Sequence, residues 1–409
     1  MEQGLYTAYA TLSTAAVASI YFGSFASLRR WKNPEDKRRT TKKQIGDSDD
    51  EQDGSGMPEN VSLGDALLSP VLGSTVLYGL HHAIGLRNPA YAKIAVAAYF
   101  TVLGMFAMAQ KGVNILHAIS RMLGFQLDSW HINLAHKSKG YYSAMFTIIH
   151  LVMLVVSILT AGYYAATQNW IIANVFGICL ALSAIQLFAL DSFKTGLFFL
   201  IGMTVHDVAW AMEAKVLASV TRSFSLPLKV IFPRLLLGLP AGQAYQFVAL
   251  GLGDIAIPGI FAALCLRFDQ HRAGTRNPAL GQSTGFRKPY FTACLAAYAL
   301  GLGSFFYTTH FFKISQPALL YLAVACILSV FMTALVRGEM KQVFGYLSEA
   351  GLKAAKARKE AEERRKRKRT QAAPVRYAPR PSRLPAVIKE ETFVPKAATS
   401  SESGLETSN

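Results

Sequence analysis

Nine runs of mainly apolar residues, each close to the length of a membrane-spanning helix, constrain this chain more than any other feature. A helix needs about 20 such residues to cross about 30 Å of hydrocarbon. With 52% hydrophobic and only 16% charged residues, the chain is too apolar for a soluble domain with a polar surface. The runs lie near residues 5–28, 66–85, 92–110, 143–163, 170–190, 195–214, 244–266, 290–311 and 317–336. The sequence therefore predicts an all-α membrane protein with nine transmembrane helices, the third of which is the least sharply bounded.

The net charge of +17 collects in two short segments, residues 29–43 and residues 353–369. Cytoplasmic loops of membrane proteins carry an excess of Lys and Arg. With the N-terminus outside, the loops assigned to the cytoplasm hold eighteen Lys and Arg residues, and the opposite loops hold seven. We therefore expect a lumenal N-terminus and a cytoplasmic C-terminus. No groove-like basic patch with interleaved aromatic residues is evident, so a nucleic-acid partner is not expected.

These runs and charges divide the chain into four expected regions. Residues 1–65 hold the first transmembrane helix and a flexible, basic cytoplasmic loop, and residues 66–190 hold helices two to five. Residues 191–345 form the half with helices six to nine, and residues 346–409 form a basic cytoplasmic tail that we expect to be largely disordered.

Two acidic residues, Asp207 and Asp254, interrupt the sixth and seventh apolar runs. An acidic residue at the centre of a spanning helix costs roughly 2.5–3.5 kcal/mol, so two of them indicate a function. Consecutive spans run antiparallel, and both residues are expected roughly 10–15 Å inside the same membrane boundary at 1.5 Å per helical residue. We therefore expect the two carboxyl groups to face each other. The structural alternative is a pair of polar residues that bond between helices.

Two facing carboxyl groups share one proton, because both cannot ionise at close range. The ionised group then accepts a proton from a water molecule that attacks a peptide carbonyl, and the protonated group donates to the carbonyl and later to the leaving amine. Gly251 and Gly253 suit this chemistry, because glycine lets a backbone or a water molecule approach Asp254 closely. Pro258 is expected to loosen or kink the same helix.

Three short motifs occur in order along the chain: HD at residues 206–207, GLGD at 251–254 and PAL at 317–319. Together they resemble the presenilin and signal peptide peptidase superfamily of intramembrane aspartyl proteases. The stretches NVFGICLALSAIQL, RSFSLPLKVIFP and QPALLYLAVACI are similar to the signal peptide peptidase branch in particular, and the resemblance covers about residues 57–345. The family fold, with nine transmembrane helices, agrees with the count of apolar runs.

The resemblance implies a role for each matching residue. Asp207 and Asp254 are the implied catalytic residues; Gly251, Leu252, Gly253, Pro317, Ala318, Leu319 and His206 are implied to support the site or to bind substrate. His206 departs from the family, whose first motif usually has tyrosine before the aspartate. We interpret His206 as a neutral helix residue rather than a catalytic one. Without the resemblance, Pro317 would be an ordinary proline at the start of a helix.

The implied activity is hydrolysis of peptide bonds within membrane-spanning segments, in the endoplasmic reticulum membrane. Expected partners are the lipid bilayer and helical transmembrane substrates, namely signal-peptide remnants and type II membrane proteins. Assembly as a homo-oligomer or within a quality-control complex is a further alternative. No cofactor is expected. The four cysteines have no CxxC spacing or nearby histidine, so no disulfide framework and no metal site are predicted. The alternatives are a proton-coupled transporter that uses the aspartate pair and a non-proteolytic quality-control binder.

Overall fold

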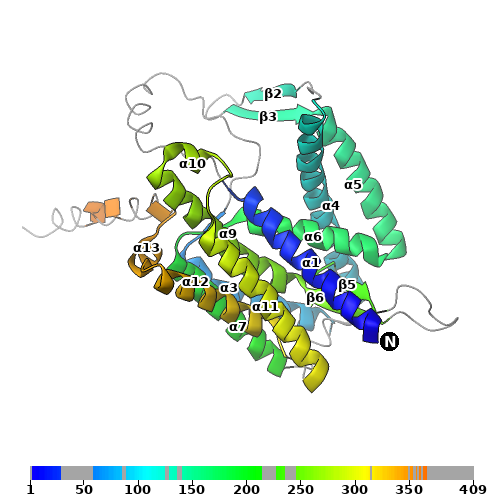
Figure 1. The fold of residues 1–409 in the computed structure, drawn as a ribbon. Coiled ribbons are helices and arrows are strands. Elements are labelled where there is room, and N and C mark those ends of the chain that lie inside the picture. Colours follow the sequence, from blue (N-terminus) through cyan, green and yellow to red (C-terminus); the bar gives the residue numbers. More distant parts are fainter. Residues whose placement is uncertain are drawn as a thin grey trace, which may run out of the picture. The chain divides into compact units, whose positions relative to one another are not determined.

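A computed structural model describes residues 2–28, 59–84, 89–124, 129–135, 141–213, 227–234, 246–313 and 316–348, with a few positions between 351 and 365. Its elements are α1 (Glu2–Ala26), β1 (Glu59–Val61), α3 (Leu63–Ile84), α4 (Pro89–Met122), β2 (Ser129–Ala135), β3 (Tyr141–Thr147), α5 (Ile148–Thr167), α6 (Trp170–Leu187), β4 (Phe188–Leu190), α7 (Phe193–Met212), β5 (Lys229–Pro233), β6 (Phe247–Gly251), α9 (Leu252–Arg276), α10 (Pro278–Gln282), α11 (Pro289–Phe312), α12 (Ala318–Val336) and α13 (Met340–Gly345) (Figure 1). Contacts divide the chain into residues 1–356 and 357–409, and every named element belongs to the first unit. The predicted basic loop, from residue 29 to residue 58, and most of the predicted basic tail lie outside the described residues.

Seven of the described helices are long and apolar enough to cross a membrane. These helices are α3, α4, α5, α6, α7, α11 and α12. The chain is thus a multi-pass membrane protein by helix length and composition. α1 and α9 occupy the two other predicted spans without being among the seven. The last ten residues of α9 include four charged ones, Arg267, Asp269, Arg272 and Arg276. The predicted total of nine transmembrane helices therefore stays a prediction.

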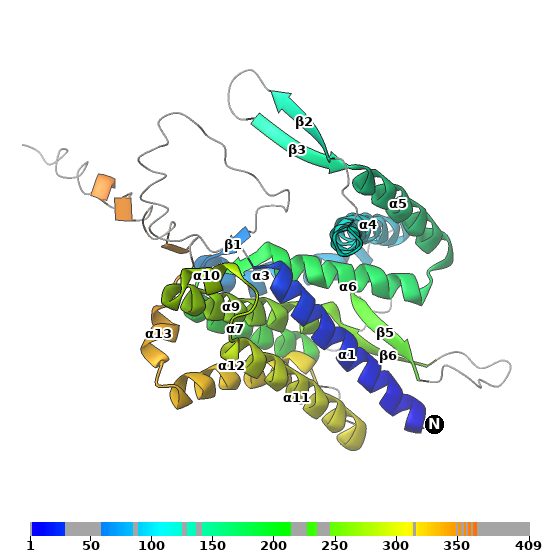
Figure 2. The same cartoon turned by 45° about the horizontal axis from the view of Figure 1, so that its top comes forward.

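The expectation of an all-α protein is wrong in detail, because three short two-stranded sheets accompany the helices in the part of the chain that the structure describes. β1 pairs with β4 in parallel, and β2 with β3 and β5 with β6 in antiparallel fashion. β2 and β3 form the hairpin that leads into α5, so this helix begins at Ile148 rather than at the predicted residue 143 (Figure 2). The third predicted span is longer than expected, since α4 has 34 residues.

The predicted span over residues 244–266 needs the largest correction. Its first part forms the strand β6, and the helix α9 begins only at Leu252. β6 pairs with β5 from Lys229 opposite Gly251 to Pro233 opposite Phe247. Glycine is a poor helix former, which favours a break at the GLGD motif. An apolar run of this kind fits a strand as well as a helix, and the partner strand decides between them.

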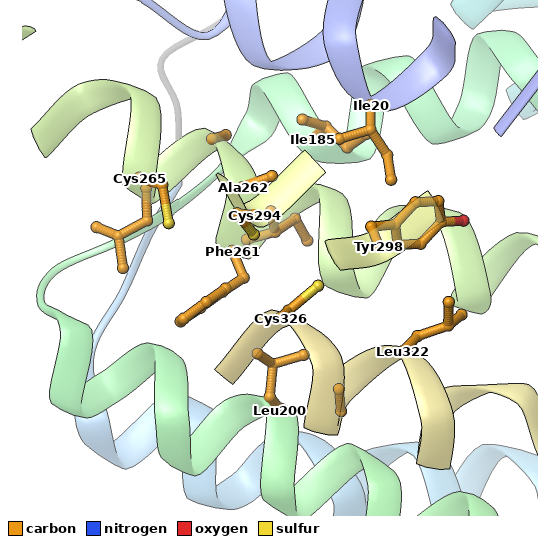
Figure 3. Close-up of a cluster of buried hydrophobic side chains, with 14 of the residues drawn as sticks. Ile20, Ile185, Leu200, Phe261, Ala262, Cys265, Cys294, Tyr298, Leu322 and Cys326 are labelled. Atoms are coloured by element: carbon orange, nitrogen blue, oxygen red, sulfur yellow. The ribbon is translucent and has the colours of Figure 1, made fainter. Parts of the chain in front are cut away.

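The core is built around α9, which packs against α1, α6, α7, α11 and α12. Thirteen residues of α9 are buried, and Figure 3 shows side chains from these helices meeting in one apolar cluster. Two glycines allow large side chains of neighbouring helices to pack closely against the backbone. A Cβ at Gly196 on α7 would lie 2.9 Å from the Phe261 ring of α9, and a Cβ at Gly259 on α9 would lie 2.5 Å from Ile185 of α6. This close packing fixes the position of α9, the helix that carries Asp254.

The remaining helices form a less buried group. α4 packs against α5 and α6, where Tyr164 and Phe176 form a second small cluster with Ala161. α3 packs against α7. Only 6% of the apolar window of α3 and 11% of that of α4 are buried, against 33% for α11 and α12. Their apolar surfaces are therefore available to lipid.

Candidate active site

Asp254 lies in the first turn of α9, directly after the strand β6. Gly251 is the N-cap residue of this helix, and its backbone lies directly against the Asp254 carboxylate. A side chain at position 251 would collide with that carboxylate, since a Cβ there would lie 2.8 Å from Asp254 Oδ2. The helix N-terminus also attracts a negative charge through its dipole. Asp254 is thus held by the residue that begins its own helix.

The backbone carbonyl of Asp254 is held by a second residue. In a regular helix this carbonyl accepts the N–H of the residue four positions later, but Pro258 has no N–H. Tyr298 on α11 fills the gap, because its hydroxyl donates to the Asp254 carbonyl oxygen at 3.2 Å. Tyr298 is 1% exposed. This residue was not predicted from the sequence, although a tyrosine inside an apolar run needs a partner for its hydroxyl.

Asp207 lies on α7, five residues before the helix ends at Met212. α7 packs against α9, and the Asp207 carboxylate is near enough to Asp254 for the two charges to interact. Both side chains are partly exposed. The structure thus brings together the two acidic residues that the sequence singled out, on neighbouring helices.

The side chain of His206 turns toward a different neighbour. A Cβ at Gly73 on α3 would lie 3.1 Å from His206 Nε2, so the imidazole lies against α3. One turn further along α7, Trp210 Nε1 donates to Ser74 Oγ at 3.1 Å and so faces the same helix. Among the residues that the structure describes, His206 Nε2 is buried without a hydrogen-bond partner. This placement favours the interpretation of His206 as a helix residue rather than a catalytic one.

The two other residues of the GLGD motif differ in their surroundings. Leu252 packs against the core, and its Cδ1 would lie 3.5 Å from a Cβ at Gly177. Gly253 is exposed, and the nearest atom to a Cβ there would be Ile257 Cδ1 at 3.6 Å. Packing therefore does not require glycine at position 253, whereas it does at position 251. A side chain at position 253 would meet few atoms of other described residues.

The PAL motif begins α12. Pro317 is the N-cap residue, and Ala318 and Leu319 are buried, at 6% and 2% exposure. α12 packs against both α7 and α9, so the motif starts the helix that contacts both aspartate-bearing helices. Its small and apolar residues suit this buried position.

Taken together, these observations define a class: a multi-pass membrane protein with an acidic pair on two packed helices. The profile of the family described as signal peptide peptidase matches residues 53–350. The chain is 33% identical over 358 residues to the signal peptide peptidase of Homo sapiens and 32% identical over 362 residues to that of Mus musculus; both alignments cover 84% of each chain. A probable intramembrane protease of Schizosaccharomyces pombe is 34% identical over 194 residues, which is 47% of this chain and 62% of that protein. The chain belongs to the signal peptide peptidase family of intramembrane proteases.

Proposed function

We propose that the protein is an aspartyl endopeptidase that hydrolyses peptide bonds within membrane-spanning segments. The observation that carries the proposal is the interaction of Asp207 with Asp254 on two neighbouring helices of an apolar protein. In this proposal the two carboxyl groups hold one proton between them and so provide a base and an acid together. The match of the signal peptide peptidase family to residues 53–350 supports the same reading.

In the proposed reaction, the ionised carboxylate accepts a proton from a water molecule while the water oxygen attacks the peptide carbonyl carbon. The protonated carboxyl group donates its proton to the carbonyl oxygen, which gives a neutral gem-diol intermediate. The carbon–nitrogen bond then breaks as the amine leaves with a proton from the first carboxyl group. This differs from the expectation from the sequence, in which the second group protonates the amine, because the second group has already given its proton to the carbonyl. A diol proton returns to the second group. One water is consumed, and no cofactor is needed.

The proposed substrates are signal-peptide remnants and type II membrane proteins. A helix in lipid hides its carbonyl groups in internal hydrogen bonds, so the substrate must unwind near the bond that is cleaved. Residues of low helix propensity at that point should favour cleavage. Gly253, which is exposed and next to Asp254 in sequence, presents no side chain to an unwound backbone or a water molecule that approaches Asp254.

The proposed arrangement has nine transmembrane helices in the endoplasmic reticulum membrane, with a lumenal N-terminus and a cytoplasmic C-terminus. The distribution of Lys and Arg between the loops supports this orientation. α1 and α9 would add two spans to the seven helices that meet the length and apolarity criteria. Assembly with itself or with a quality-control complex is a further element of the proposal.

The test uses purified protein in liposomes with a labelled signal peptide. We expect the wild-type protein to cleave the peptide, and D207N and D254N to leave it intact. E213Q is a matched control, because it removes an exposed negative charge from the end of the same helix α7 and should cleave normally. Proton flux into the liposomes without peptide products would instead indicate a transporter. Equal binding of intact peptide by the wild type and D254N, without products, would indicate a binder.

A further inference from the structure

The carboxamide of Asn174 on α6 bonds both backbone groups of one residue in β5. Asn174 Nδ2 donates to the Ile231 carbonyl oxygen at 2.7 Å, and the Ile231 N–H donates to Asn174 Oδ1 at 2.9 Å. A neighbouring strand would offer the same kind of pairing, one acceptor and one donor to a single residue. A side chain here takes the place of a third strand.

The pairing of the hairpin explains why Ile231 needs such a partner. Arg234 N donates to Gln246 O at 2.8 Å, and Leu252 N donates to Leu228 O at 2.9 Å across the hairpin. Hydrogen-bonded and non-hydrogen-bonded pairs alternate along an antiparallel ladder. Ile231, which stands opposite Ala249, therefore directs its N–H and carbonyl away from β6. In a membrane these groups need a partner from the protein, because lipid offers none.

One face of α6 is shaped to receive the hairpin. Trp170, Asn174 and Gly177 recur at intervals of four and three residues, so they lie on one side of the helix. The Trp170 ring lies 6.2 Å from that of Phe232 in β5 and 6.0 Å from that of Phe247 in β6. At the other end of this face, a Cβ at Gly177 would lie 3.4 Å from the Pro227 carbonyl oxygen. Asn174 is the polar residue at the middle of this contact.

The hairpin leads directly to the aspartate. β6 ends at Gly251, and Asp254 is the third residue of the helix that follows. A Cβ at Gly251 would lie 2.8 Å from Asp254 Oδ2, so the Gly251 backbone lies against the carboxylate and a shift of the hairpin would displace it. We propose that Asn174 is a positioning residue: by holding β5 through Ile231, it fixes the strand pair that sets the place of the Asp254 carboxylate. This role rests on the proposed proteolytic function.

The test compares variants of Asn174 in the full-length protein in liposomes. N174L has nearly the same shape but leaves both Ile231 groups without their partner, and N174Q keeps the carboxamide on a longer side chain. S183A is the matched control, since it removes a buried α6 hydroxyl that lacks a hydrogen-bond partner among the described residues. The measurements are kcat, KM and the masses of the peptide products, together with the melting temperature of each variant.

For N174L we expect kcat to fall on the order of 10- to 100-fold with KM little changed, because the catalytic group is misplaced rather than the substrate lost. New product masses should appear as neighbouring peptide bonds are cut. N174Q should recover part of kcat, and S183A should match the wild type. Three results would overturn the positioning role. The first is a wild-type kcat and product pattern in N174L. The second is a decrease in activity of N174L that is fully explained by a smaller amount of folded protein, and the third is an equal decrease of kcat in N174Q and N174L. A wild-type protein that cleaves no peptide would instead defeat the proposed function, and the role of Asn174 with it.

Discussion

The two aspartates sit in very different surroundings. Asp254 is at the start of α9, whose thirteen buried residues make it the centre of the core; its carboxylate lies against the Gly251 backbone, and its backbone carbonyl accepts a hydrogen bond from Tyr298. Asp207 is in the second half of α7. All five buried residues of α7 lie in the first half, between Phe193 and Leu200, and no residue from Ile201 to Met212 is buried. One carboxylate is fixed by its surroundings, and the other is on a helix segment with an open side.

This difference suits an enzyme whose substrate is itself a helix in the membrane. A catalytic pair must be positioned closely, yet one side must stay open for a large apolar substrate. Val205 is 62% exposed and Met212 is 83% exposed, so the segment around Asp207 presents an apolar surface. We interpret Asp254 as the more rigidly held residue of the pair. The exposed surface of α7 around Asp207 is then the surface that contacts the substrate.

Alanine at each aspartate tests this comparison most severely. D207A and D254A should each lower cleavage by on the order of 10³-fold or more, because the pair acts as a unit. Their stabilities should differ, since D254A also removes a negative charge from the first turn of α9, where the helix dipole favours it by about 0.3–1 kcal/mol. Peptide cleavage and denaturant unfolding of both variants measure the two effects. Equal stabilities would mean that Asp254 is no more firmly held than Asp207.

The next largest effect is expected at Gly251. In G251A the new Cβ would lie 2.8 Å from Asp254 Oδ2, so the carboxylate must move. A displacement of this size should lower kcat on the order of 100-fold. G253A is the matched variant, because its Cβ would meet only Ile257 Cδ1 at 3.6 Å. We expect G253A to fold as the wild type does and to retain more activity than G251A. The reverse order would contradict the site geometry.

A smaller effect is expected at Tyr298. In Y298F the Asp254 carbonyl loses the hydroxyl at 3.2 Å, and Pro258 supplies no N–H in its place. Leaving a buried carbonyl without a partner costs about 1–3 kcal/mol. We expect a lower melting temperature and a decrease in kcat that the double variant Y298F/P258A partly reverses, because alanine restores the helical N–H. Full activity and stability in Y298F would show that the Asp254 backbone needs no support from α11.

The sequence predicted the last two long helices well and the hairpin of β5 and β6 not at all. α11 covers Pro289–Phe312 and α12 covers Ala318–Val336, within one residue of the predicted 290–311 and 317–336, because apolar length alone defines such segments. The strand β6 was missed because its partner β5 lies upstream of residues 235–245, a separation that no local pattern reports.

Within the site, the predictions depended on charge. Asp207 and Asp254 stand out because acidic residues are rare in apolar runs. Asn174 and Tyr298 were missed because an uncharged polar residue in an apolar run has a lower free-energy cost than a charged one and is therefore a weaker signal of function. Their roles depend on which backbone groups lack a partner, namely the Ile231 groups at the hairpin edge and the Asp254 carbonyl before Pro258. Counting unpaired backbone groups requires the fold.

The smallest effect is expected at His206, next to Asp207 in sequence. Its imidazole lies against α3 at Gly73, and its Nε2 is buried without a partner among the described residues. H206L should therefore change kcat/KM by less than about threefold, because it removes no group from the reaction. Its stability should be unchanged or higher, since a buried polar atom without a hydrogen bond is replaced by carbon. H206Y, which introduces the tyrosine expected from the family resemblance, is the matched variant. A tenfold decrease of kcat/KM in H206L that is recovered in H206Y would mean that the side of α7 facing α3 also positions Asp207. Less of the α7 surface around Asp207 would then be free to meet substrate than its exposure indicates.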